Sequence, residues 1–241
     1  MFLSSQLLAL SMIVLSFVLP AAKESDGRAA LTSAADASQK SIVSVAPFTS
    51  VELRNGGKAI LRHGPSQRVT FIKGSSNCTD VMVGNGDRLI IDTGKRECPR
   101  GYELEIEIVT PNLKGLAVAN GGLLQSLGDF PGQTAIALAV NQGGVLDVRS
   151  FAVQSVTAAV KSGGKILVKP QSSLVASVSD GGVITYWGNA AVTSSIKQGG
   201  IIGKGTAAEA DEPVSDLNPC LSAIPSVPPV PPVAPRRSYW W

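Results

Sequence analysis

The sequence LAVANGGLL at residues 116–124 is followed 22 residues later by LAVNQGGVL at residues 138–146. In both, a Gly-Gly doublet separates two short runs of alternating apolar residues, and a short polar or amide residue precedes the doublet. From residue 116 onward the doublet occurs five times, as Gly121 and Gly122, Gly143 and Gly144, Gly163 and Gly164, Gly181 and Gly182, and Gly199 and Gly200. Glycine reaches positive φ without steric cost, so each doublet predicts a corner between two strands.

Apolar columns stay in register with these glycines. The column three places before the first glycine is Val118, Val140, Val160, Val178 and Ile196, and the column two places after the second is Leu124, Leu146, Ile166, Ile184 and Ile202. Successive side chains on a strand point to opposite faces, so both columns face one interior. A period near twenty residues with two strands per unit predicts a β-solenoid, with the corner glycines in one file along one edge. A flexible Gly/Ser linker is the alternative, but it needs no such columns.

The amino-acid composition also favours a β-solenoid. The chain is 44% hydrophobic but only 5% aromatic and 16% charged, which suits thin repetitive β-structure better than a helical core. The net charge is +3, and no dense run of Lys or Arg occurs, so we expect no nucleic-acid partner.

The first residues predict export. Residues 7–19 form an apolar run that is followed by Pro20-Ala21-Ala22, the pattern of a signal peptide. A membrane span is the alternative, but the run is short of the ~20 residues needed. We expect a signal peptide at 1–22, a flexible lead-in at 23–41, a β-solenoid domain with a β-rich N-terminal half at 42–205, and a disordered proline-rich tail at 206–241. The protein would then reside in the periplasm, on the cell surface or outside the cell.

Two features of the N-terminal half predict local structure: a Gly-Gly tripeptide and a pair of cysteines. Asn55-Gly56-Gly57 predicts a hairpin or a corner. Cys78 and Cys98 bracket a strand-turn-strand unit, which in an exported protein suggests a disulfide that stabilises the fold by about 3 kcal/mol. The alternatives are two independent thiols or a metal site with His63. Cys220 in the tail would be a free thiol or an intermolecular bridge.

The end of the tail allows two interpretations. Residues 225–235 are proline-rich and predict an extended polyproline II segment that ends in Arg236-Arg237-Ser238-Tyr239-Trp240-Trp241. In the first interpretation it is a semi-rigid spacer. In the second, its cationic and aromatic side chains contact a membrane interface or a partner protein.

No catalytic, cofactor or metal motif is present, and His63 beside Gly64-Pro65 is interpreted as a solvated loop residue. Parallel β-solenoids include polysaccharide lyases and hydrolases, and the charged candidates for such chemistry are Asp129, Asp147, Arg149, Lys161, Lys165, Lys169 and Asp180. Lys161 and Asp180 fall on neighbouring coils, where opposite charges ordinarily complement each other at the surface.

The region from Phe48 to about Ile202 resembles the putative auto-transporter adhesin head GIN domain family of bacterial envelope proteins. The residues that carry the resemblance are Phe48–Leu53, Asp87–Ile91, Glu105–Leu116 and the Gly-Gly corners. The resemblance implies a signal peptide, an early β-rich part and a right-handed single-stranded β-solenoid (β-helix). It supplies no catalytic residues.

The sequence therefore predicts a non-catalytic binding or adhesion-like module of the cell envelope. Its outward residues Thr157, Ser177, Thr193 and Ser195 would form flat polar rows suited to a glycan or a protein surface. The alternatives are a polysaccharide-acting enzyme on the same scaffold and a structural envelope protein without a specific ligand.

Overall fold

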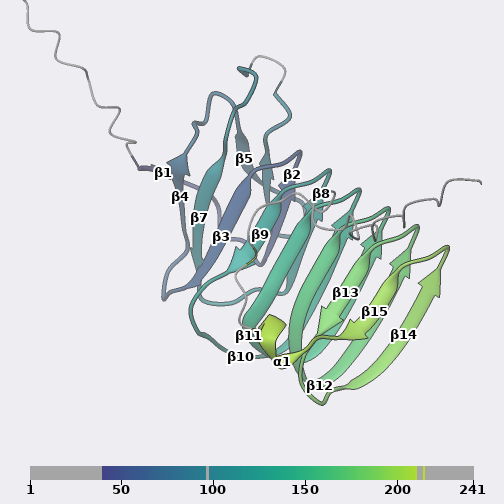
Figure 1. Cartoon of the computed structure of the whole chain (residues 1–241). Helices are drawn as coiled ribbons and strands as arrows, with labels where there is room; N and C mark the ends of the chain where they lie inside the picture. Colours follow the sequence, from purple (N-terminus) through teal and green to yellow (C-terminus); the bar gives the residue numbers. More distant parts are fainter. Residues whose placement is uncertain (1–39, 96–97, 211–213, 215–241) are drawn as a thin grey trace, which may run out of the picture. The chain divides into compact units, whose positions relative to one another are not determined.

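A computed structural model describes residues 40–95, 98–210 and 214 of the chain. The described part is all-β, as the sequence predicted, and it contains fifteen strands and one four-residue helix (Figure 1). None of its helices is long and apolar enough to cross a membrane. The expected signal peptide and the proline-rich end of the tail lie outside the described residues.

The strands are β1 (Ser41–Val43), β2 (Ser50–Arg54), β3 (Lys58–His63), β4 (Arg68–Lys73), β5 (Asp80–Gly84), β6 (Arg88–Asp92), β7 (Glu105–Thr110), β8 (Gly115–Ala119), β9 (Leu123–Ser126), β10 (Phe130–Asn141), β11 (Val145–Lys161), β12 (Lys165–Ser179), β13 (Val183–Tyr186), β14 (Ala191–Lys197) and β15 (Ile201–Lys204). The helix α1 (Ala207–Ala210) lies in the segment that the sequence assigned to the tail.

The Gly-Gly corners stack on one another. The strands before the corners pair in parallel with each other, and so do the strands after them. At each corner, the backbone N–H after the doublet donates to the second glycine of the preceding unit; Val145 N to Gly122 O, for example, is 2.9 Å. The residue before each doublet and both of its glycines have positive φ, as at Gln142 (58°), Gly143 (85°) and Gly144 (96°). The corner glycines thus lie in one file (Figure 1).

The file extends further towards the N-terminus than the five doublets. Asn55-Gly56-Gly57 is its first corner, since Leu123 N donates to Gly57 O at 2.9 Å. The hairpin alternative for this tripeptide is therefore wrong, because β2 and β3 flank it in two different strand rows: β2 pairs with β8, and β3 pairs with β9.

The spatial order departs from the chain order at this end. β6 pairs in parallel with β2, and β7 pairs in parallel with β3, so the later unit lies outside the earlier one. Beyond it, β5 pairs antiparallel with β6, and β4 pairs antiparallel with β7 and with β1. These antiparallel strands cover the edges of the parallel rows, which would otherwise expose unpaired backbone groups.

The predicted columns form the core along most of the stack. Val118, Val140, Val160 and Val178 are 1–2% exposed. The column ends at Ile196, which is 50% exposed, because β14 pairs only with β12 within the described chain. The sequence pattern alone could not distinguish this edge unit from the internal ones.

Cys78 and Cys98 form a disulfide, with their Cα atoms 5.4 Å apart. It joins the segment between β4 and β5 to the segment before β7. Tyr102 connects the same two segments, because its hydroxyl accepts from Ser75 N at 2.9 Å and lies 2.8 Å from Thr79 Oγ1. The cross-link and the tyrosine hold the antiparallel strands over the end of the stack.

Candidate functional site

The strands before the corners present one continuous outward face, which we call the pre-corner face. It is formed by β2, β8, the ends of β10, β11 and β12 nearest their corners, and β14. Parallel pairing aligns its outward side chains into rows across the strands. One row is Ser50, Gly115, Ala137, Thr157, Val175 and Thr193, and the next is Glu52, Ala117, Ala139, Ala159, Ser177 and Ser195. The four polar residues singled out from the sequence lie in these two rows.

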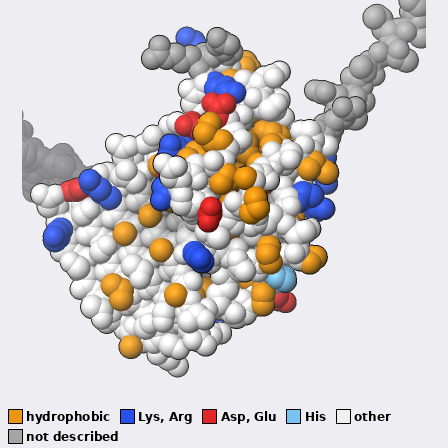
Figure 2. Space-filling view, turned by 180° about the vertical axis from the view of Figure 1, so that it is seen from behind, with side chains coloured by type: hydrophobic (Ala, Val, Ile, Leu, Met, Phe, Trp, Pro, Cys, Tyr) orange, Lys and Arg blue, Asp and Glu red, His pale blue; other side chains and the backbone are white. Residues whose placement is uncertain are grey.

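Most of these side chains are short, and they alternate along each strand with the buried columns. Ala137, Ala139, Thr157 and Ala159 are all exposed. Figure 2 shows the molecule from behind: over the lower part of this view hydrophobic side chains are scattered singly on a mostly uncharged surface, and in the upper part they gather more densely beside charged ones. Such a surface can accept an extended ligand without displacing long side chains.

One part of this face is hollowed into a shallow groove of about 690 Å³. Its floor consists of small residues of β8 and β10, including Gly115, Ala117, Ala119, Ala137 and Ala139. Charged side chains line one side of it, namely Glu52 of β2, Arg88 of β6 and Lys114, which directly precedes β8. We call this hollow the alanine groove.

The carboxylate of Glu52 anchors the charged side of the groove. Glu52 is only 8% exposed, and it accepts from Arg54 Nε at 2.7 Å and from Arg88 Nη1 at 3.1 Å. The hydrogen bond from Arg54 is the main reason that the pKa of Glu52 lies below its ordinary value; burial acts in the opposite direction, and Arg88 adds to the lowering. Glu52 is therefore ionised at neutral pH and holds two guanidinium groups in place.

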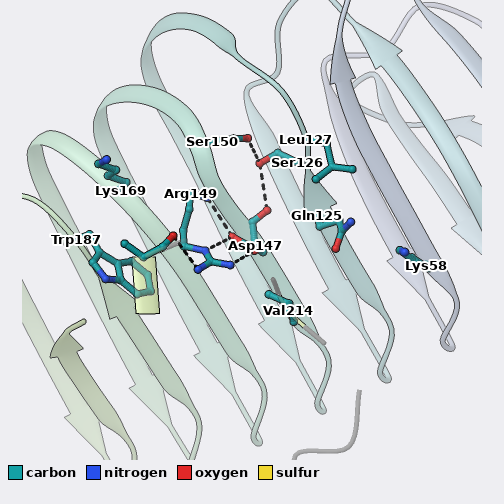
Figure 3. A pocket seen from close by; sticks show the side chains of 11 residues that line it. Lys58, Gln125, Ser126, Leu127, Asp147, Arg149, Ser150, Lys169, Trp187 and Val214 are labelled. Carbon is teal, nitrogen blue, oxygen red and sulfur yellow. Dashed lines mark hydrogen bonds and ion pairs between the residues drawn. The ribbon is translucent and has the colours of Figure 1, made fainter. Parts of the chain in front are cut away.

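A second cavity, of about 550 Å³, lies over the strands that follow the corners (Figure 3). Here Arg149 donates to both oxygens of Asp147, with Nε–Oδ1 at 2.9 Å and Nη2–Oδ2 at 2.7 Å. Arg149 Nη1 also donates to the carbonyls of Glu209 and Ala210 at the end of α1, at 2.6 and 3.0 Å. The guanidinium carbon lies 5.5 Å from the centre of the Trp187 ring.

These contacts give the second cavity a structural role. The Asp147 and Arg149 side chains are 12% and 13% exposed, and the cation of Arg149 satisfies carbonyls that a helix end leaves without partners. Trp187 Nε1 donates to Thr206 O at 2.7 Å, so the same cluster fixes both ends of the segment that carries α1. The pairing leaves Asp147 poorly suited to act as a general base, because both of its oxygens already accept hydrogen bonds.

The remaining charged candidates do not form one centre. Lys169 lines the second cavity, and with Asp129 it also lines a neighbouring hollow. Lys161 and Asp180 are exposed near the corners, with Lys161 in register with Ser179. His63 lies at the end of β3 rather than in a loop, with its ring 5.9 Å from that of Phe130. Among the described residues, no group of three or more potential ligands is placed to hold a metal.

The alanine groove was not predicted from the sequence. Its signal was present, since small residues alternate with the buried columns at 115–119 and 137–141. The charged side could not be found in this way, because Glu52 and Arg88 are 36 residues apart and meet only through the pairing of β2 with β6.

The fold and the groove thus define an all-β protein of stacked parallel strands with a hollowed outer face. Residues 132–190 match the family described as "Putative auto-transporter adhesin, head GIN domain", which confirms the family resemblance recognised in the sequence. This match begins within β10, runs past the end of β13, and is shorter than the region from Phe48 to Ile202 that carried the resemblance.

Three solved structures are similar at a low level. A putative adhesin from Bacteroides fragilis is 17% identical, with 69% of this chain and 95% of that chain covered and a TM-score of 0.39. A putative lipid binding protein from Parabacteroides distasonis is 12% identical, with coverages of 70% and 96% and a TM-score of 0.29. A putative cell adhesion protein from Clostridium sporogenes is 13% identical, with coverages of 69% and 98% and a TM-score of 0.34. No curated protein matches the chain. Similarity of this degree transfers no function to this protein.

Proposed function

We propose that this protein is an exported, non-catalytic binding module of the cell envelope and that it binds an extended surface polymer along the alanine groove. In this proposal the stacked strands of residues 42–205 form a right-handed β-solenoid, residues 1–22 direct export, and the proline-rich tail is a spacer. The family match over residues 132–190 supports an adhesion-like role.

The observation that carries the proposal is the register of the pre-corner face. Residues of equal height recur from strand to strand, as Ala117, Ala139 and Ala159 do, at the regular strand separation of about 4.8 Å. A rigid surface with a regular repeat suits a ligand that itself repeats, because each ligand unit meets an equivalent set of groups. Exposed hydroxyls at Thr157, Ser177 and Thr193 offer hydrogen bonds on three neighbouring strands, β11, β12 and β14.

The test is to block the groove without disturbing the core. Ala139→Arg places a long side chain on the exposed floor, and Ala46→Arg adds the same side chain at an exposed residue outside the strands. We expect the unaltered protein and Ala46→Arg to bind immobilised envelope polysaccharide saturably, and we expect Ala139→Arg to lose binding while its urea unfolding midpoint stays unchanged. Equal binding by both variants would contradict a role for the groove.

Depolymerisation of the polysaccharide by the purified protein would overturn the non-catalytic part of the proposal. Reducing-end release on prolonged incubation measures this directly. The paired state of Asp147 argues against turnover in the second cavity. No ion pair among the described residues joins Lys161 to Asp180.

A further inference from the structure

Resting on the proposed function, we infer that the charged side of the alanine groove is an anion subsite, in which Lys114 and Arg88 flank Ser50, and that the polymer bound there is acidic. The groove would receive an uncharged stretch of the polymer on its alanine floor and a carboxylate or sulfate group at this side.

Strand pairing brings the two cations to opposite sides of β2. Arg88 on β6 is in register with Ser50, and Ser50 is in register with Gly115 on β8. Lys114 immediately precedes Gly115, and its backbone N–H donates to Thr49 O at 2.7 Å, which fixes the start of β8 against β2. Arg88, Ser50, Thr49 and Lys114 all line the groove.

The local charge balance leaves this side positive. Glu52 is the acidic residue in the groove lining, and each of its oxygens already accepts from an arginine, Oε1 from Arg54 and Oε2 from Arg88. Arg88 uses Nη1 for this contact, and no bond of the described residues occupies its Nε or Nη2. Lys114 forms no ion pair with another described residue, and it is exposed.

This arrangement matches the chemistry of an oxyanion. A guanidinium held by a buried carboxylate keeps a fixed orientation, so its remaining donors are preorganised for a second acceptor. Lysine adds a compact charge on the other side of β2, and Thr49 and Ser50 at the start of β2, which also line the groove, supply hydroxyl groups. Asp87, next to Arg88 and exposed, is the nearest acidic residue in sequence and opposes anion binding.

The experiment measures binding of the full chain to two acidic probes and their uncharged counterparts by titration calorimetry. Dextran sulfate is compared with dextran, and polygalacturonate with its methyl ester, so the arms distinguish a sulfate from a carboxylate. Lys114→Met and Arg88→Gln should each weaken binding of an acidic probe by about tenfold at low salt, because each removes a charged contact. Asp87→Asn should strengthen it.

Lys197→Met is the matched control, since it removes one positive charge from an exposed site on the same face but outside the groove. Equal effects of Lys114→Met and Lys197→Met would overturn the anion subsite, as would failure to bind either acidic probe. Loss of all binding in Ala139→Arg, together with unchanged binding in Lys114→Met and Arg88→Gln, would leave the groove as the binding site and refute its acidic specificity.

Discussion

Adjacent corner glycines provide a direct test of the stacking geometry. At Gly144 (φ +96°), an added Cβ would lie 2.6 Å from Val118 Cγ1 and 3.0 Å from Gly122 O. At Gly143 (φ +85°), an added Cβ meets nothing within 4 Å. Both alanine variants therefore bear backbone strain, but only Gly144→Ala also overlaps the preceding unit.

The expected magnitudes follow from these contacts. Positive φ costs an alanine about 1–3 kcal/mol at either position. The overlap at Gly144 adds about 1–3 kcal/mol, because Val118 is 1% exposed and cannot move outward, and because Gly122 O accepts the corner hydrogen bond from Val145. The free energy of unfolding of Gly144→Ala should thus be lower than that of Gly143→Ala by the cost of the overlap, about 1–3 kcal/mol.

Urea unfolding of both variants, followed by circular dichroism with the disulfide intact, measures the difference. Val118→Ala removes the methyl groups that the new Cβ meets, so in a double-mutant cycle it should cost less in the Gly144→Ala background than in the unaltered protein. Equal midpoints for the two glycine variants, or additive effects in the cycle, would refute the close stacking of the corners.

Three further outcomes are expected. The pKa of Glu52 is lowered below its ordinary value of 4.5, chiefly by Arg54, so its ionised form stabilises the fold above that pH. This stabilisation is lost as the pH falls through the lowered pKa. Glu52→Gln should therefore reduce the loss of stability at acidic pH, measured as the urea unfolding midpoint at a series of pH values. Arg149→Met should destabilise the fold by about 3–5 kcal/mol, because it leaves the buried Asp147 without its cation. The same variant should speed proteolysis near α1, because Arg149 donates to the carbonyl of Glu209 there. The control variant Lys204→Met, at an exposed site, should have neither effect. Replacing both Cys78 and Cys98 with Ser should lower the stability by about 3 kcal/mol, measured as a shift in the urea midpoint against the reduced and the oxidised parent protein.

The repeat was readable from the sequence because its causes are local. Side-chain alternation sets the buried columns at Val118, Val140, Val160 and Val178, and the need for positive φ sets the glycines between strands. The disulfide between Cys78 and Cys98 could also be predicted, since the two residues bracket a short strand-turn-strand unit.

Contacts between residues distant in the sequence decided the order of the strands at the N-terminal end and the position of the candidate site. The position of β6 and β7 outside β2 and β3 depends on antiparallel partners that the repeat does not encode, and it creates the contact of Glu52 with Arg88. Arg149 donates hydrogen bonds to the carbonyls of Glu209 and Ala210 in α1, which follow it in the sequence by 60 and 61 positions. Periodicity specifies which side of a strand faces inward, but only the packed chain determines which outward side chains become neighbours and therefore where a ligand can bind.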